Sequence, residues 1–433
     1  MTKRLALPPH HQLYEELAAT FDLTRERIDL AHGRSRLSIR TFPFSSAGTL
    51  QPQSAAREPN RTFRALVSFF LENNPFSRRN FDHGLDSASV DIEENREFRY
   101  AVFTPGTTES EPVARTADTR QEVPGFARAT LLLHGLNEKS WNKYLPWAAR
   151  LAVLTGRPVI LFPIAFHMNR APDAWADPRE MMGVARERRR LFPGLEAGSF
   201  ANAALSQRIQ FAPHRFLTSG LETYFNIVDF VREVSSGSHP LFAAGARVDL
   251  FGYSIGASLA QLLLMANRDR LFSDSRAFLF CGGAVLDQAN PVSRAIMDDE
   301  AYRAVFAFLR EFASDPTAAL PLESDAAESM HRELETIRSM LFLDHRRDAR
   351  EWLVGSIAPR VRGLVLADDH VFHPGGMIAS WRRTDGASLL DVAVGEPAYR
   401  YAHEQPFPHR GPDLEAVDRF FDETMERAAA ALG

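Results

Sequence analysis

The feature that most constrains the fold of this chain is the segment VDLFGYSIGASLAQLLL, residues 248–264. Its first half is an apolar run typical of a buried strand, and its second half has helical spacing and begins with small residues. Gly252 and Gly256 flank Ser254 where the strand would become the helix. Such a turn forces its central residue toward a positive φ and crowds the residues two before and two after it, so those must be small. The segment therefore predicts a strand–turn–helix unit with the Ser254 hydroxyl projecting from the end of a sheet.

Strand and helix patterns alternate regularly from residue 126 onward. Apolar runs predict strands within residues 127–135, 157–166, 246–254, 275–286, 360–372 and 387–395, with helices at 140–156, 216–237, 255–267 and 413–433. Alternating strands and helices indicate βαβ units and a mostly parallel sheet flanked by helices, an α/β fold. Ligands in such sheets bind at the carboxyl ends of the strands. The polar, arginine-rich stretch 168–213 is expected to be a long excursion from the sheet.

The first 125 residues are less regular. Residues 11–21 predict a short helix, and residues 34–44 and 96–105 predict strands, whereas residues 45–60 and 107–125 have the composition of loops. Residues 287–358 are helical in pattern and too long for a simple crossover, which needs only about a dozen residues. We therefore expect an N-terminal extension (1–125) packed on a core (126–286 and 359–433) that is interrupted by a helical insertion (287–358).

Composition excludes several classes of function. A net charge of −5 over 433 residues does not indicate a nucleic-acid partner. Cys281 is the only cysteine, which rules out an intrachain disulfide and a cysteine-based metal cluster. The sequence has neither a signal-peptide pattern nor an apolar run of about 18 residues that could span a bilayer, so a cytoplasmic protein is expected. The glycine-rich turn lacks the dinucleotide fingerprint, and we expect no cofactor.

Two motifs together resemble the α/β-hydrolase superfamily. They are Gly252-Tyr253-Ser254-Ile255-Gly256 and the upstream LLLHGL of residues 131–136, and the resemblance covers roughly Phe126 to the C-terminus. It implies an α/β-hydrolase fold in which a nucleophilic serine, an acid and a histidine follow one another in the chain, with an oxyanion hole beside the serine. Insertions such as residues 287–358 often form a helical cap over the pocket in this superfamily.

The resemblance also implies where the oxyanion donors should lie. One backbone N–H would come from Ile255, directly after the serine, and the other from the loop that carries His134-Gly135. Leu136 is the expected second donor, with Asn137 as its alternative. His134 itself is interpreted as a structural residue of this loop.

The acid should follow a late strand, and GLVLADDHVF offers Asp369 at such a strand end. Asp368 is the near alternative, and Asp287 is a third candidate because some members of the superfamily place the acid after the preceding strand. Each of these aspartates could instead cap a helix.

The base should follow one further strand, and His403 occupies that loop, with His409 as the alternative. His370 and His373 are interpreted as local loop residues. An H-x-x-H pair without a second ligand cluster is weak support for a metal site, so no metal is expected.

These residues predict a serine hydrolase of carboxylic esters, thioesters or amides, with a small-molecule acyl substrate. An acyltransferase would use the same Ser254, His403 and Asp369. The alternative from another class is a non-catalytic protein of this fold that binds a small molecule or a partner. The sequence leaves the oligomeric state open, with a homodimer as one option.

Overall fold

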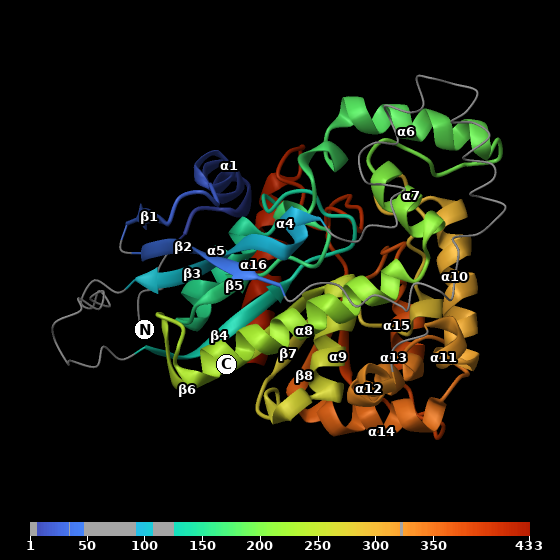
Figure 1. The fold of residues 1–433 in the computed structure, drawn as a ribbon. Coiled ribbons are helices and arrows are strands. Elements are labelled where there is room, and N and C mark those ends of the chain that lie inside the picture. Colours follow the sequence, from blue (N-terminus) through green and yellow to red (C-terminus); the bar gives the residue numbers. More distant parts are fainter. Residues whose placement is uncertain (1–6, 34, 47–91, 107–124, 321–323) are drawn as a thin grey trace.

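The computed structural model describes residues 7–33, 35–46, 92–106, 125–320 and 324–433. These residues form a nine-stranded sheet in the order β1-β2-β3-β5-β4-β6-β7-β8-β9 (Figure 1). The strands are β1 (Arg27–His32), β2 (Ser35–Ser45), β3 (Glu97–Gly106), β4 (Phe126–Leu133), β5 (Val159–Leu161), β6 (Phe242–Tyr253), β7 (Ala277–Phe280), β8 (Val361–Leu366) and β9 (Asp391–Gly395).

The direction of the strands divides the sheet into two parts. Every neighbouring pair from β5 through β4, β6, β7 and β8 to β9 is parallel, whereas β1–β2, β2–β3 and β3–β5 are antiparallel. The chain passes from β4 to β5 on one side and then crosses back to β6 on the other side of β4. This reversal opens a crevice at the carboxyl ends of β4 and β6, where ligands bind in open parallel sheets. Strand order, direction and flanking helices confirm the predicted α/β-hydrolase fold.

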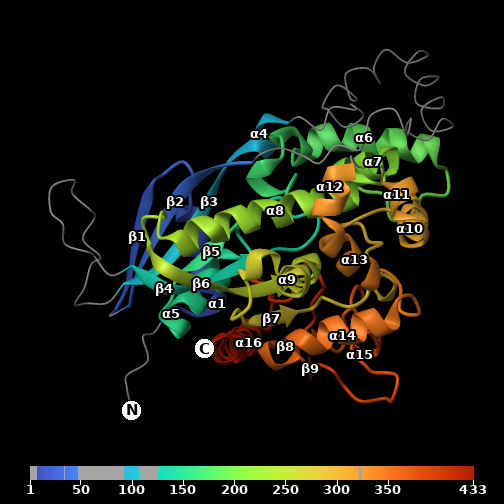
Figure 2. The ribbon, with the colours of Figure 1, turned by 60° about the horizontal axis from the view of Figure 1, so that its bottom comes forward.

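Helices cover both faces of the sheet (Figure 2). One face carries α1 (His10–Thr20), α5 (Leu145–Thr155) and α16 (Leu414–Leu432), and the other carries α8 (Arg215–Ser236), α9 (Ile255–Ala266) and α14 (Arg347–Ile357). The remaining helices are α4 (Glu93–Arg96), α6 (Pro178–Leu191), α7 (Ala203–Phe211), α10 (Asp299–Ser314), α11 (Pro316–Ala319), α12 (Ser324–Ser329), α13 (His331–Ser339) and α15 (Pro374–Ser380). Among the described helices, none combines the length and the apolar character that a bilayer crossing requires.

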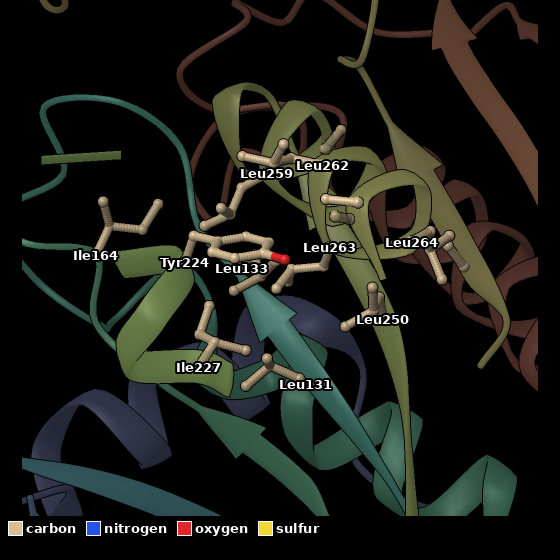
Figure 3. Packing of buried hydrophobic residues seen from close by; sticks show 14 of the residues in the cluster. Leu131, Leu133, Ile164, Tyr224, Ile227, Leu250, Leu259, Leu262, Leu263 and Leu264 are labelled. Carbon is tan, nitrogen blue, oxygen red and sulfur yellow. The ribbon is translucent and has the colours of Figure 1, made fainter. Parts of the chain in front are cut away.

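The central strands β4 to β8 are buried on both faces over most of their length, which explains why they are largely continuous apolar runs. The edge strand β1 and its neighbour β2 alternate between buried and more exposed residues. In β6, Leu250 packs with α8 and α9, whereas its neighbour Phe251 points to the opposite layer with α5 and α16. Figure 3 shows the first of these layers, with Leu131 and Leu133 of β4 beside Ile227 and Tyr224 of α8. The elements that carry the candidate site are therefore held from both sides.

The N-terminal residues extend the sheet. The predicted strands correspond to β2 and β3, the predicted helix to α1, and β1, which the sequence did not predict, forms the edge. Apart from residues 45, 46 and 125, the two predicted loops lie outside the described residues. The strand expected at 157–166 is shorter, because only Val159–Leu161 pairs with β4 and β3.

The stretch 168–213 is more ordered than the sequence suggested. It contains α6 and α7, whose apolar positions Met181, Val184, Ala203 and Ala204 form a small core of their own. The many arginines in this stretch interrupt the spacing of apolar residues that would have predicted these helices. Arg188 of α6 is itself buried and pairs with Asp298, the N-cap of α10, at 2.7 Å.

A second buried arginine ties the N-terminal residues to the core. Arg170 Nη2 lies 2.8 Å from Glu222 Oε1, and both side chains have no exposed surface. The same guanidinium donates to Asn95, Pro163 and Asn226 and lies over the ring of Phe98. Burial lowers the pKa of Arg170 to about 10, although Glu222 opposes that shift. The guanidinium therefore remains charged near neutral pH.

Replacing Arg170 by Met should lower the free energy of unfolding by about 3–5 kcal/mol, because Glu222 would be left as a buried charge without its counterion. Arg232→Met is the matched control, since Arg232 is 45% exposed in its pair with Asp229 and such surface pairs contribute at most about 1 kcal/mol. Urea unfolding of both variants measures the difference. Equal losses would contradict the anchoring role of Arg170.

A buried histidine predicts how stability depends on pH. His239 lies against Tyr100, with His239 Nε2 3.0 Å from the Tyr100 hydroxyl, and His239 Nδ1 accepts from the Leu241 N–H. Burial lowers the pKa of His239 from 6.5 to about 4. Between these values the unfolded chain binds a proton that the folded chain does not, so this histidine makes stability fall as the pH drops from 6.5 to 4.

His239→Asn should remove that contribution, which is about 3 kcal/mol across the interval. The variant's free energy of unfolding should therefore change less than that of the parent between pH 7 and pH 4. Substitution of the exposed His331 by Asn serves as control and should leave the slope unchanged. Parallel pH profiles for the parent and His239→Asn would refute the assignment.

Candidate active site

The site begins at the turn between β6 and α9. Ser254 has φ 57° and ψ −125°, a region that residues with a side chain rarely occupy. The Ser254 N–H donates to Phe280 O at 3.1 Å, and Ala257 N–H donates to Ser254 O at 3.0 Å. These bonds hold the backbone in this conformation. Ser254 is 4% exposed and lies at the carboxyl end of β6.

Three glycines make this turn possible by their lack of a side chain. A Cβ on Gly252 would lie 2.5 Å from Ala257 Cα, and one on Gly256 would lie 2.4 Å from Leu133 O. The sequence identified both. It missed Gly282, where a Cβ would lie 2.1 Å from Ser254 O. The pair Gly282-Gly283 directly after an apolar run was the signal that could have revealed this close approach.

The strain at Ser254 predicts an unusual order of stabilities. Ser254→Gly should be more stable than Ser254→Ala by about 1 kcal/mol, because glycine adopts this conformation without a steric penalty and alanine does not. At Ser258, inside α9, the order should reverse, with Gly less stable than Ala by about 1 kcal/mol. Urea unfolding of the four variants tests this. If the alanine variant is more stable than the glycine variant at both positions, the backbone at Ser254 is unstrained.

The structure brings Ser254, His403 and Asp369 together from three different elements. His403 Nε2 lies 2.8 Å from Ser254 Oγ. On the other side of the ring, His403 Nδ1 lies 3.0 Å from Asp369 Oδ1 and 2.9 Å from Asp369 Oδ2. His403 is 2% exposed and Asp369 is 1% exposed. The imidazole thus links the hydroxyl to the carboxylate, and all three side chains are buried.

The Asp369 carboxylate is stabilised in its charged form. Burial alone would raise its pKa, but the hydrogen bond from His403 and two backbone N–H donors, Val371 and Phe372, each 2.9 Å away, lower the pKa below its usual value. A carboxylate beside Nδ1 favours the tautomer with the proton on Nδ1, which leaves Nε2 able to accept the serine proton.

The alternative candidates for the acid and the base make other contacts. Asp368 is exposed in the turn after β8, and its N–H donates to the Tyr401 hydroxyl at 2.7 Å. Asp287 accepts from the Leu343 N–H at 3.0 Å and so fixes the insertion. His409 stacks on Tyr14 at 3.7 Å between ring centroids, far along the loop from His403. Spacing along the chain favoured Asp369 and His403, but the contacts made by the alternatives depend on how each loop folds back.

Of the two neighbouring histidines, His373 belongs to its own loop, whereas the His370 ring lies edge-on to His403 at 6.3 Å between centroids. His373 caps α15 by accepting from the Gly375 N–H, and His370 is largely exposed, with Nε2 3.9 Å from Glu404. Within the described ranges, no group of three or more His, Cys, Asp or Glu side chains is arranged to hold a metal ion.

The loop after β4 lies next to the serine. Ile255 is the first residue of α9, so its N–H has no acceptor within the helix. Leu136 and Ile255 both line the pocket that contains Ser254. His134 is buried, and its Nε2 accepts from the Ile164 N–H at 2.9 Å, which fits the structural role expected for it.

A polar network that the sequence did not predict joins this loop to the loop of His403. The Tyr144 hydroxyl accepts from the Gly135 N–H at 2.9 Å and donates to Glu138 at 2.7 Å. Lys143 pairs with the same Glu138 and donates to Glu404 O at 2.9 Å. The Tyr253 hydroxyl in turn donates to His403 O. The backbone on both sides of Ser254 is therefore held by one set of hydrogen bonds.

Two adjoining cavities lie above the serine. The first, called the outer pocket, contains Ser254, and its wall comes largely from the insertion 287–358, including Met297, Tyr302, Val305 and Phe306. The second, called the inner chamber, lies between α7, α8, α9 and α13. Arg208 and Arg215 of the arginine-rich stretch lie on its wall. Residues of the insertion thus form part of the pocket that contains Ser254.

Comparison with known proteins places the chain in a family. Residues 9–433 match the sequence profile described as "Family of unknown function (DUF6051)". The chain belongs to this family. No curated protein matches it.

The DUF6051 chain is also similar to solved structures. A cold-adapted esterase from an Arctic intertidal metagenomic library is 11% identical, with 92% of this chain and 97% of that one covered and a TM-score of 0.36. A peroxisomal α/β-hydrolase from Saccharomyces cerevisiae is 11% identical, with 92% and 91% covered and a TM-score of 0.38. An S-formylglutathione hydrolase from Agrobacterium tumefaciens is 12% identical, with 94% and 100% covered and a TM-score of 0.39.

Proposed function

We propose that this DUF6051 protein is a serine hydrolase that cleaves a carboxylic ester through an acyl-serine intermediate. The observation that carries the proposal is the continuous line of hydrogen bonds from Ser254 Oγ through His403 to Asp369. A serine hydroxyl is a weak nucleophile on its own, and an adjacent imidazole oriented by a carboxylate is the arrangement that activates it.

In the first half of the proposed reaction, His403 Nε2 takes the proton of Ser254 as Oγ bonds to the ester carbonyl carbon. The carbonyl oxygen becomes negative and accepts from the N–H groups of Ile255 and Leu136. When the tetrahedral intermediate collapses, His403 gives its proton to the leaving alcohol. Asp369 keeps the imidazole oriented and stabilises its positive charge.

In the second half, His403 takes a proton from water, and the hydroxide oxygen bonds to the acyl carbon. Collapse breaks the bond to Ser254 Oγ, which recovers its proton, and the carboxylic acid leaves. The apolar outer pocket supports an ester with a hydrocarbon acyl group, although thioesters and amides follow the same steps. An acyltransferase would differ only in using another nucleophile in place of water.

The proposal predicts a specific covalent label. A fluorophosphonate should modify Ser254 in the parent protein, as peptide mass spectrometry would reveal, and should leave Ser254→Ala unmodified. Asp369→Asn should slow both labelling and ester hydrolysis by about 10³–10⁴-fold, because the asparagine favours the wrong histidine tautomer. Asp368→Asn is the matched control and should react like the parent.

Failure of labelling in a folded parent protein would support the alternative, a non-catalytic protein that binds a small molecule in the same pocket. Labelling at a residue other than Ser254 would also contradict the proposal. Equal rates for Asp369→Asn and Asp368→Asn would remove Asp369 from its proposed role. Circular dichroism of each variant separates these results from unfolding.

A further inference from the structure

The inner chamber and the outer pocket share part of their walls. Five residues line both spaces, namely Leu136, Phe216, Ile255, Leu286 and Leu309. The two spaces therefore adjoin directly beside Ser254. A group attached to the reacting carbon would meet these apolar side chains on its way into the chamber.

The chamber wall is apolar along one face of α9. Ile255, Leu259, Leu262 and Met265 line it, and their spacing places them on a single side of the helix. Leu259 and Leu262 are both visible on this helix in Figure 3. Opposite them, α13 contributes Ile337. An alkyl chain fits such a wall, because burying each methylene there is favourable.

A glycine keeps the chamber open. Gly220 lines the chamber from within α8, and a Cβ at that position would meet no atom within 4 Å. Glycine inside a helix is destabilising relative to alanine, so helix formation gives no reason for it here. A larger side chain at Gly220 would grow into the space.

One polar side chain in the wall meets no partner. Gln261 is 1% exposed and lines the chamber, yet neither its Nε2 nor its Oε1 has a hydrogen-bond partner among the described residues. Gly283 lies beside the amide, where a Cβ would come within 3.2 Å of it. A buried amide without partners is costly, and such groups in native proteins need an explanation.

We propose that the inner chamber binds the distal part of a long acyl chain and that Gln261 binds a hydroxyl group on that chain. This inference rests on the proposed function, since it names the substrate class of the same site. A hydroxyl can accept from Gln261 Nε2 and donate to Gln261 Oε1, whereas a carboxylate could only accept. Gln261 lies seven residues beyond Ser254, a rise of about 10 Å along the helix, so the hydroxyl lies well away from the ester carbonyl.

The chain belongs to the acyl part of the ester and not to the alcohol. Ile255 and Leu136, the proposed donors to the carbonyl oxygen, line both cavities. The acyl carbon bonded to Ser254 Oγ would sit between them, and its substituent would continue past them into the chamber. The alcohol leaves on the side of His403, which protonates it.

The first experiment varies acyl length alone, with p-nitrophenyl acetate, butyrate, octanoate and dodecanoate. In the parent protein, kcat/KM should rise with length by up to about fourfold per methylene. In Gly220→Leu the value for dodecanoate should fall at least about tenfold, and far more than the value for acetate. Gly355→Leu is the matched control, because Gly355 is an exposed helix glycine whose Cβ would meet only Leu389, at 3.9 Å.

The second experiment tests the hydroxyl. A series of p-nitrophenyl hydroxydodecanoates with the hydroxyl at successive carbons should show one position that is preferred over unsubstituted dodecanoate. Gln261→Leu should abolish that preference, so that the ratio of kcat/KM for the preferred hydroxydodecanoate to that for dodecanoate falls to about one or below. A hydroxyl preference that survives in Gln261→Leu would refute the role of Gln261.

Several results would overturn the chamber assignment. The first is an equal kcat/KM for acetate and dodecanoate in the parent. The second is an equal loss of kcat/KM for all esters in folded Gly220→Leu. The third is a dependence on chain length that appears only in a series of alkyl acetates, in which the alcohol is varied. If no ester is cleaved and Ser254 is not labelled, the proposed function fails. The chamber is then tested by binding: dodecanoate should raise the Tm of the parent and of Gly355→Leu but not of Gly220→Leu, and no shift in any of them would refute it.

Discussion

The turn at Ser254 is the constraint on which the rest of the site depends. A residue at positive φ between a strand and a helix can exist only where its surroundings hold it there. Here the surroundings are main-chain atoms. The start of α9 lies against Gly252, the end of β4 against Gly256, and the backbone of Ser254 against Gly282, so closely that none of these glycines can carry a side chain. The hydroxyl is fixed by contacts between main chains, which vary little when side chains move.

The other groups of the site are built outward from this point. β8 and β9 extend the same parallel sheet, so the loops that follow them bring Asp369 and His403 to the edge where β6 ends. Hydrogen bonds through Tyr144, Glu138 and Lys143 connect the backbone near Leu136 with that of Glu404. Apolar side chains of the helical insertion line the pocket that contains Ser254. An apolar environment of this kind strengthens electrostatic interactions within it.

Much of this could be predicted from the sequence because it depends on short-range rules. The glycine spacing around Ser254, the alternation of strands and helices, and the position of Asp369 after a late strand are local features of the chain. The choice of His403 over His409 relied on distance from a strand and agrees with the observed contact to Ser254.

The missed features depend on contacts between residues far apart in the chain. Gly282 is needed only because Ser254 O approaches it, and the pairing of Arg170 with Glu222 looks like two surface charges until the fold buries them. α6 and α7 were obscured because Arg188, which is charged, occupies a buried position that a hydrophobic pattern leaves blank. The two cavities are lined by residues from five helices, so no single segment of the sequence could predict them.

The contact between α1 and α16 has a consequence for biosynthesis. His11 Nδ1 lies 2.7 Å from Asp418 Oδ2, across a separation of 407 residues, so α1 cannot make this contact until α16 has left the ribosome. The strand and helix that hold Ser254 emerge well before Asp369 and His403. A nascent chain thus displays its serine without the groups proposed to activate it, and reactivity would begin only after His403 has emerged.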